Sequence, residues 1–136
     1  MKLSRTVAYA LQATLQLAQS KTEAPVPCSR LAAEGKMPER FLLQILRSLV
    51  SHGILESTRG VDGGYSMGRE PGDVSLLEVI EAIDGPLVSA LPTCDGMPAK
   101  SKSRLKSALA EVTKATRRDL AAVKLADLMP IGRKNK

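Results

Sequence analysis

Three polar side chains of the kinds that read DNA bases lie at helical spacing in this sequence. Arg40, Gln44 and Arg47 are four and three residues apart, so a helix places them on one face, and Ser51 continues that face. Arginine can form paired hydrogen bonds with guanine, and glutamine can do the same with adenine. This pattern favours base recognition, and an ordinary surface helix with exposed Arg and Gln is the alternative.

A glycine-rich segment with a further arginine follows this predicted helix. Residues 54–58 and 65–67 are short strand candidates, and 59–64 between them contains three glycines, which can adopt the positive φ angles of a tight hairpin loop. A hairpin beside a helix-turn-helix is a wing. We expect Arg59, at the start of its loop, to enter the minor groove, where narrow A·T segments concentrate negative potential.

Three predicted helices must position these side chains. They span residues 2–20, 28–34 and 38–51, and the second and third stop at Gly35 and Gly53. The apolar positions of the first are Leu3, Val7, Leu11, Leu15 and Ala18. The predicted buried face of the third consists of Phe41, Leu42, Ile45, Leu46 and Leu49. Two short helices joined by a tight turn, the second with an Arg/Gln outer face, indicate a helix-turn-helix.

The second half of the chain has the pattern of a dimerisation region. Ser75 and Glu78 have capping-box spacing at the start of a helix that ends at Gly85. The residues of that helix predicted to face inward are Leu76, Val79, Ile80 and Ile83. Residues 86–100, with three prolines and a glycine, are expected to be irregular, and mobile or ordered only by a partner.

A long helix is predicted from about residue 101 to 123. Its apolar stripe is too long for so small a domain to bury alone, so pairing with the same helix of a second copy is expected. Packing on the chain's own first helix is the alternative, and both arrangements are expected to occur together. The stripe consists of Leu105, Leu109, Val112, Ala115, Leu120 and Val123.

Charge and composition favour double-stranded DNA as the partner. Of the net charge of +6, residues 1–72 carry +3, residues 73–98 carry −5 and residues 99–136 carry +8. Basic ends suit a polyanion, and the acidic middle is expected to face away from it. The aromatic residues are Tyr9, Phe41 and Tyr65. Binders of RNA and single strands stack bases on more aromatic side chains than these.

Other function classes are disfavoured. A single histidine, no Cys/His pair at useful spacing and no phosphate-binding loop argue against an enzyme. No apolar run approaches the roughly 20 residues that span a membrane. The first residues superficially resemble a signal peptide, but Gln12, Thr14 and Gln16 interrupt the apolar stretch at helical spacing. We therefore expect a cytoplasmic protein.

Short motifs run through the helix-turn-helix, the wing and the helix behind them. They are Val26-Pro27, Leu31-Ala32, Met37-Pro38, Phe41-Leu42, Gln44-Ile45-Leu46, Leu49, Gly53-Ile54-Leu55, Ser57, Arg59-Gly60, Gly63-Gly64-Tyr65, Val74-Ser75-Leu76, Val79-Ile80 and Ile83. With them the chain resembles the Rrf-type bacterial transcription regulators from Met1 to about Met129, and the Arg-Gly and Gly-Gly-Tyr motifs of the wing are the most specific part. The resemblance implies a mainly α-helical, homodimeric winged-helix protein that binds a palindromic operator, usually as a repressor.

The resemblance and the expected geometry together give a set of DNA-contacting residues. They are Lys2, Ser4 and Arg5 at the start of the first helix, Pro38, Glu39, Arg40, Gln44 and Arg47 on the recognition helix, and Arg59, Gly60, Gly64 and Tyr65 on the wing. Family resemblance supports Gln44 most directly. Glu39 and Arg40 depart from the small hydroxyl residues of some relatives, so a different sequence preference is expected.

The cysteines bear on the signal that the protein senses. Iron–sulfur members of this family carry three cysteines in the loop before the long helix, whereas Cys94 is alone there, followed by Met97, Pro98, Lys102 and Arg104. Some relatives use a histidine early in the long helix as the fourth ligand, and Ser107 lies near that position. A cluster normally takes four protein ligands, so no cofactor is expected.

Two residues outside that loop could also do redox or metal chemistry. Cys28 lies at a predicted helix start, where backbone N–H groups can lower a thiol pKa, but a small buried hydrophobe is the favoured interpretation. His52 is expected to close the recognition helix rather than bind metal. An iron–sulfur or thiol redox sensor using Cys94 or Cys28 is the alternative.

The sequence is thus predicted to have four parts. They are a winged helix-turn-helix domain at 1–85, an irregular loop at 86–100 in the family's sensor-loop position, a dimerisation helix and short terminal helix at 101–129, and a basic tail at 130–136. A small-molecule or protein effector is expected to act near the dimer helices. The rival class is a protein-interaction module whose acidic segment, 73–98, docks a partner enzyme.

Overall fold

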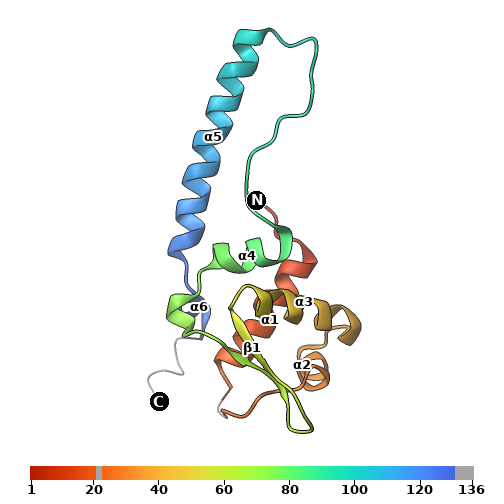
Figure 1. Cartoon of the computed structure of the whole chain (residues 1–136). Coiled ribbons are helices and arrows are strands. Elements are labelled where there is room, and N and C mark those ends of the chain that lie inside the picture. Colours follow the sequence, from red (N-terminus) through yellow and green to blue (C-terminus); the bar gives the residue numbers. More distant parts are fainter. Residues whose placement is uncertain (21–22, 131–136) are drawn as a thin grey trace.

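The computed structural model describes residues 1–20 and 23–130, so most of the predicted basic tail lies outside the described residues. In chain order the elements are α1 (Arg5–Ala18), α2 (Cys28–Gly35), α3 (Glu39–Ser51), β1 (Leu55–Thr58), β2 (Gly64–Met67), the 3-10 turn η1 (Pro71–Asp73), α4 (Leu76–Asp84), α5 (Ala99–Ala122) and α6 (Leu125–Leu128). Figure 1 shows α1 to α4 and the hairpin gathered into one body, with α5 and the loop before it extending away. The mainly α fold with a hairpin wing and a long C-terminal helix is confirmed.

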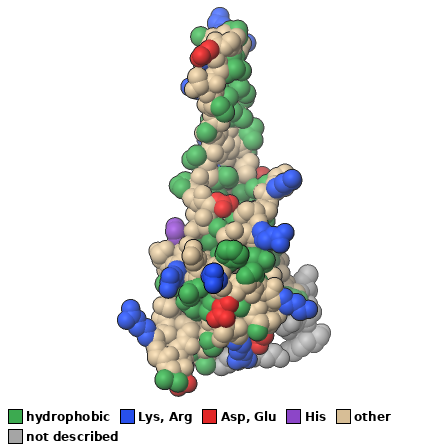
Figure 2. Space-filling view, turned by 90° about the vertical axis from the view of Figure 1, so that its right-hand side faces the viewer, with side chains coloured by type: hydrophobic (Ala, Val, Ile, Leu, Met, Phe, Trp, Pro, Cys, Tyr) green, Lys and Arg blue, Asp and Glu red, His purple; other side chains and the backbone are tan. Residues whose placement is uncertain are grey.

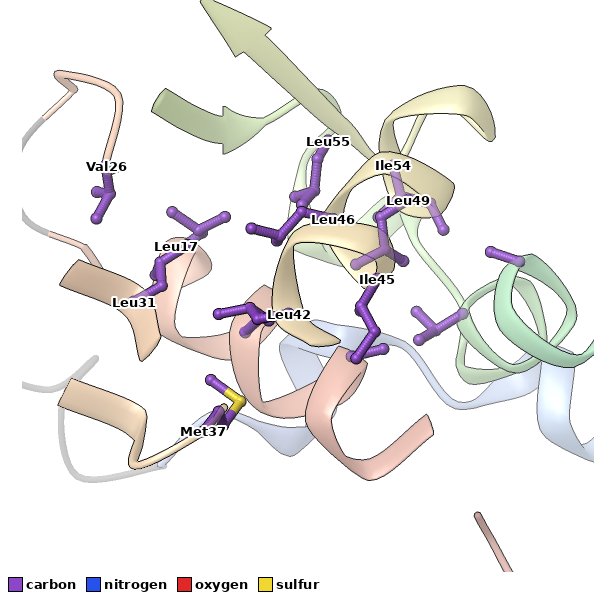
Figure 3. Packing of buried hydrophobic residues seen from close by; sticks show 14 of the residues in the cluster. Leu17, Val26, Leu31, Met37, Leu42, Ile45, Leu46, Leu49, Ile54 and Leu55 are labelled. Atoms are coloured by element: carbon purple, nitrogen blue, oxygen red, sulfur yellow. The ribbon is translucent and has the colours of Figure 1, made fainter. Parts of the chain in front are cut away.

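The core lies between α1, α2, α3 and the base of the hairpin. In Figure 3 the side chains of Leu17 from α1, Leu31 from α2 and Leu46 from α3 gather beside Leu55 of β1. Leu125 of α6 is also fully buried in this cluster. Burying a leucine side chain contributes about 1.5–3 kcal/mol, so these contacts hold the helix-turn-helix and the wing in a fixed relation.

α1 begins at Arg5, later than predicted, because Ser4 caps it: the Val7 N–H donates to Ser4 Oγ at 3.1 Å. The predicted apolar stripe is partly wrong, since Leu3 is exposed and lies before the helix. The buried residues are Val7, Ala10, Ala13, Thr14 and Leu17. Hydrophobicity alone misses Thr14, whose hydroxyl donates to the Leu11 carbonyl at 2.9 Å and is thereby satisfied inside the core.

α2 ends at Gly35, as predicted, and the turn to α3 is made by the residue that follows. Lys36, not Gly35, adopts the left-handed conformation, with φ 54° and ψ 47°. Gly35 lies against α1: a Cβ there would be 2.6 Å from Nε2 of Gln12 and 2.7 Å from Oε1 of Gln16, so these two side-chain ends would have to shift. Gln12 Nε2 donates to the Gly35 carbonyl at 2.6 Å, which ties the turn to α1.

α3 follows Pro38, as predicted, and His52 forms its C-cap. The His52 Nδ1 lies 2.9 Å from the Ser48 carbonyl, in agreement with a helix-closing role. The predicted buried residues Leu42, Ile45, Leu46 and Leu49 are buried. The prediction for Phe41 is wrong: its side chain is 63% exposed, because its position is turned away from the centre of the apolar stripe.

α4 begins at the predicted capping box. The Glu78 N–H donates to Ser75 Oγ at 3.1 Å, and the Ser75 N–H donates to Glu78 Oε1 at 2.9 Å. The predicted inward face is only partly correct, since Leu76 and Ile83 are half-buried. The buried residues are Leu77, Val79, Ile80 and Ala82. α4 packs against α1, α3 and α5. Its buried face is therefore wider than a single stripe and does not coincide with the predicted one.

α5 begins two residues earlier than predicted, so the irregular loop occupies 85–98. Its main helical contact is with α4 and not with α1, as the alternative supposed. The Arg117 guanidinium donates to the Glu81 carboxylate and to the Leu87 carbonyl, the latter at 3.1 Å, and the Leu87 N–H donates to Glu81 Oε2 at 2.7 Å. The start of the loop is therefore held by the chain itself, contrary to the expectation that only a partner orders it. No described helix combines the length and apolar character needed to cross a membrane.

An ion pair joins the segment between β2 and η1 to α4 and gives a pH-dependent prediction. Arg69 donates through Nη1 to Glu78 Oε2 at 2.7 Å and through Nη2 to Oε1 at 3.2 Å, and this pairing lowers the pKa of Glu78. Both side chains are partly exposed, so we expect Glu78→Gln to lower the free energy of unfolding by only about 0.5–1 kcal/mol at pH 7. Gln can still accept the Ser75 N–H, so the cap is kept.

The difference between wild type and Glu78→Gln should disappear in acid. A lowered carboxyl pKa stabilises the fold above the ordinary glutamate value of about 4.5, and this stability is lost as the pH falls through the lower, folded-state value. Urea unfolding at pH 7 and pH 3 measures both differences. An equal difference at the two pH values would contradict the assignment.

Candidate nucleic-acid interface

The outer face of α3 carries the predicted base-reading residues, and all three are available to a ligand. Arg40, Gln44 and Arg47 are exposed, and within the described part of the chain no hydrogen bond or ion pair holds their side chains. Figure 2 shows the side of the molecule on which α2 and α3 lie in Figure 1, with blue basic side chains spread over its lower half among green hydrophobic ones. The face combines positive charge with free hydrogen-bonding groups, which base and phosphate recognition requires.

Pro38 and Glu39 form the N-terminal end of α3. Pro38 is its N-cap residue, with extended backbone, and Glu39 is an exposed acidic residue in the first turn. A carboxylate at this position can accept a hydrogen bond from the N4 amino group of cytosine but repels phosphate. Glu39 therefore fits a contact with a base better than one with the backbone.

The start of α1 supplies two further exposed basic side chains, Lys2 and Arg5. Ser4 has a structural role as the N-cap residue, because its Oγ accepts the Val7 N–H. The first turn contains no acidic residue, so the positive end of the helix is not neutralised locally. Backbone N–H groups at such an end favour an anion such as phosphate.

The wing is joined to the segment before α2 by a pair of backbone hydrogen bonds. Val26 N–H donates to the Tyr65 carbonyl at 2.9 Å, and Tyr65 N–H donates to the Val26 carbonyl at 2.8 Å. Gly64, at φ +154°, makes this pairing possible, since a Cβ there would lie 2.4 Å from the Val26 carbonyl carbon. The half-buried Tyr65 side chain packs against the core. Through these contacts Gly64 and Tyr65 position the wing.

The tip of the wing presents Arg59. β1 and β2 pair antiparallel from Leu55↔Met67 to Thr58↔Gly64, so Arg59 is the first residue of the loop and is exposed. Of the three loop glycines, Gly60 and Gly64 have positive φ, whereas Gly63 is needed for space, because a Cβ there would lie 2.1 Å from the Thr58 carbonyl oxygen. The loop is thus shaped by its own backbone and leaves the Arg59 guanidinium free to contact a ligand.

Two exposed residues of this face were not assigned from the sequence. The sequence pattern places Phe41 in the core and ends α2 at Gly35, and it gives Lys36 no role. The exposed Lys36 lies in the turn between α2 and α3, close in sequence to the start of the recognition helix. A helical projection centred on the middle of the stripe, rather than on one residue, places Phe41 at the edge of the buried face, so part of this signal is present in the sequence.

Cys28 lies at the start of α2, but its environment does not activate it. Burial raises the pKa of the Cys28 thiol, and the nearby Glu39 carboxylate raises it further. The sulfur lies 3.8 Å from the Glu39 carbonyl, and the side chain packs against the core. The possibility that the helix start lowers this pKa is wrong, and the contacts are those of a small hydrophobe.

Cys94 is exposed in a turn before α5, in which the Met97 N–H donates to its carbonyl at 3.3 Å. The first two turns of α5 carry Lys100, Lys102, Arg104 and Lys106. In Figure 1 this end of α5 lies at the opposite end of the molecule from α2. Within the described residues of one chain, no group of three or more His, Cys, Asp or Glu could hold a metal ion. One thiol among ammonium and guanidinium groups does not fit an iron–sulfur cluster, which takes four ligands.

Comparisons with known proteins agree with this geometry. The Rrf2 family model, described as an iron-dependent transcriptional regulator, matches residues 3–131. A putative HTH-type transcriptional regulator, rrf2-like, from Rhodobacter capsulatus is 34% identical over 120 residues, covering 81% of this chain and 80% of that protein. The HTH-type regulator CymR of Bacillus subtilis is 31% identical over 118 residues, covering 85% and 86%.

The same fold is found among solved structures. That of CymR, the global cysteine regulator of B. subtilis, superposes with a TM-score of 0.72 at 25% identity and covers 94% of this chain and 95% of that one. The family model extends through the helix-turn-helix, the wing and the long helix, and the two relatives each match more than four fifths of the chain. This chain belongs to the Rrf2 family of transcriptional regulators.

Proposed function

We propose that this protein is a homodimeric repressor that binds a palindromic operator, with α3 in the major groove and the wing in the adjacent minor groove. The observation that carries the proposal is the combination of a free Arg40, Gln44 and Arg47 face on α3 with a wing fixed beside it by the Val26–Tyr65 pairing. A repressor needs no catalytic group, because occupying the operator excludes other proteins.

The exposed surface of α5 supports the dimer. No residue of this 24-residue helix is buried in one chain, and Val112 in its apolar stripe is 61% exposed. Two such helices paired along their stripes would bury them. They would also hold two recognition helices at a fixed separation, and successive major grooves on one side of DNA require about 34 Å.

The proposal includes regulation without an iron–sulfur cluster held by the chain's own residues. The family description names iron, but Cys94 and its basic neighbours are not the ligand set of a cluster. We propose that a small molecule or protein bound near the dimer helices changes their spacing and thereby the fit to the operator. Thiol oxidation is the less favoured route, since the raised pKa of Cys28 reduces its thiolate fraction.

The protein-interaction alternative is weakened by contacts within the chain. Its acidic segment, 73–98, includes Glu78 and Glu81, which are paired with Arg69 and Arg117. A partner enzyme would have to compete with these pairs for the two carboxylates. Selecting binding fragments from random double-stranded DNA tests the proposed function directly: a palindromic consensus, bound less tightly as salt rises, supports it. Failure to enrich any sequence would contradict it.

Gln44→Ala is expected to lower operator affinity by about 1–3 kcal/mol at one base pair of each half-site and to relax the base preference there. The reason is that a glutamine amide can pair bidentately with adenine, whereas alanine cannot. Affinities for operators substituted at each position measure the effect. Ser51→Ala, at the far end of the same exposed face, is the control. Equal weakening on every sequence would mean that Gln44 contacts only the backbone.

Replacing both cysteines, Cys28→Ser with Cys94→Ser, should leave operator affinity unchanged. The proposal gives neither thiol a role in holding a cluster. Wild type and variant are purified without oxygen, assayed for iron and compared in DNA binding. Stoichiometric iron in the wild type, lost in the variant together with DNA binding, would overturn regulation without a cluster.

A further inference from the structure

We propose that Phe41 contacts the 5-methyl group of a thymine in the major groove and selects thymine at one position of each operator half-site. The inference rests on the proposed function, because it requires α3 to enter that groove. It adds an apolar, specificity-determining contact to a face otherwise described by its charges and amides.

The exposure of Phe41 is exceptional within its own helix. Every other apolar residue of α3 is buried or half-buried, whereas Phe41 is 63% exposed. The others are Leu42, Leu43, Ile45, Leu46, Leu49 and Val50. Phe41 is also the only phenylalanine of the chain. A ligand that covers this ring therefore buries apolar surface that is exposed to water in the folded chain, which is favourable.

The position of Phe41 directs it toward the base edges. It is the third residue of α3, and the first turn of a recognition helix is the part that reaches base edges in helix-turn-helix complexes. Gln44 lies three residues further on, so the two side chains are neighbours on the helix surface. Arg40 and Arg47 lie on the same exposed side and favour a polyanion over an apolar protein surface as the ligand.

Thymine is the base whose chemistry matches this side chain. It alone presents a methyl group in the major groove, and apolar side chains such as phenylalanine contact that group. Covering one methyl group contributes a free energy that corresponds to an affinity difference of about threefold to fivefold. The expected signature is a preference for thymine over uracil, since these bases differ only by the methyl group.

The test uses a selected operator in which thymines are replaced one at a time, in both half-sites together, by deoxyuridine. For the wild-type protein we expect one such replacement to weaken binding by about threefold to fivefold per half-site and the others to have little effect. Phe41→Ala should bind the thymine and uracil forms at that position equally. Phe41→Leu, which keeps an apolar side chain, should retain part of the discrimination.

The controls separate this inference from the proposed function. Because Phe41 is exposed, both variants should unfold at the wild-type temperature, and Val88→Ala, an exposed apolar residue of the loop before α5, should retain the full thymine preference. Selective DNA binding by the wild type with no thymine preference at any position would overturn the Phe41 contact alone. So would an unchanged preference in Phe41→Ala. Absence of any selective DNA binding would overturn the proposed function as well.

Discussion

Replacing Val112 with glutamate should convert the proposed dimer into monomers and lower affinity for the full operator by about 100-fold or more, the usual scale of the gain from linking two binding units. Val112 lies in the α5 stripe with 61% of its side chain exposed in one chain. A carboxylate there would be buried at the centre of the paired helices, opposite its own copy. Uncompensated burial of charge strongly disfavours such pairing.

The loss on DNA should exceed the loss of any single base contact. Once one subunit of a dimer has bound its half-site, the other subunit is held near the second half-site at a high effective concentration. A monomer lacks this gain in affinity. Sedimentation gives the oligomeric state, and titration of a full operator and an isolated half-site gives both affinities. Val112→Glu should bind an isolated half-site with the same affinity as the wild-type protein, because the α3 face is unchanged.

Ala110→Glu is the matched control for Val112→Glu. It adds the same charge to an exposed position two residues away on α5, but on the opposite side from the stripe. We expect this variant to stay dimeric and to bind the full operator with nearly wild-type affinity. A dimeric Val112→Glu protein with unchanged operator affinity would show that α5 does not form the interface.

The winged helix-turn-helix could be predicted because its signals are local. The Ser75–Glu78 capping box depends on two residues at fixed spacing, and both of its hydrogen bonds are present. The Arg59–Gly64 segment forms a hairpin because its glycines meet the backbone requirements of the loop. The face of Arg40, Gln44 and Arg47 follows from helical geometry alone, and all three are exposed.

What the sequence could not supply depends on contacts between elements. α2 ends at Gly35, as predicted, but the residue that takes the left-handed conformation is the following Lys36, which nothing in the local sequence singles out. The spacing of apolar residues puts Phe41 at the edge of the buried stripe, but whether a side chain at the edge is covered depends on where α1 and α4 pack on α3. Likewise, burial beside Glu39 raises the pKa of Cys28, and that packing is not visible from its place at a helix start.

Arg59→Ala should weaken specific operator binding by about tenfold to a hundredfold, the effect of losing a charge-assisted hydrogen-bonding group. The backbone pairing of Val26 with Tyr65 holds the wing beside the helix-turn-helix before DNA binds. A prepositioned arginine loses less conformational entropy on entering the groove than one on a free loop would. The effect should be greatest on operators with A·T base pairs under the wing, where the minor groove is narrow and its potential most negative.

Lys2→Ala should act differently from Arg59→Ala, because a phosphate contact carries no base information. We expect Lys2→Ala to weaken binding equally on all sequences and to reduce the magnitude of the slope of log affinity against log salt concentration by about 1. Arg118→Ala removes an equal charge from the exposed side of α5 and should change neither specificity nor the response to A·T content. Titrations at several salt concentrations, on operators with A·T or G·C under the wing, distinguish the three variants. If Arg59→Ala weakened binding no more than Arg118→Ala does, or if a structure of the complex placed the Arg59 guanidinium in solvent, the minor-groove assignment would be wrong.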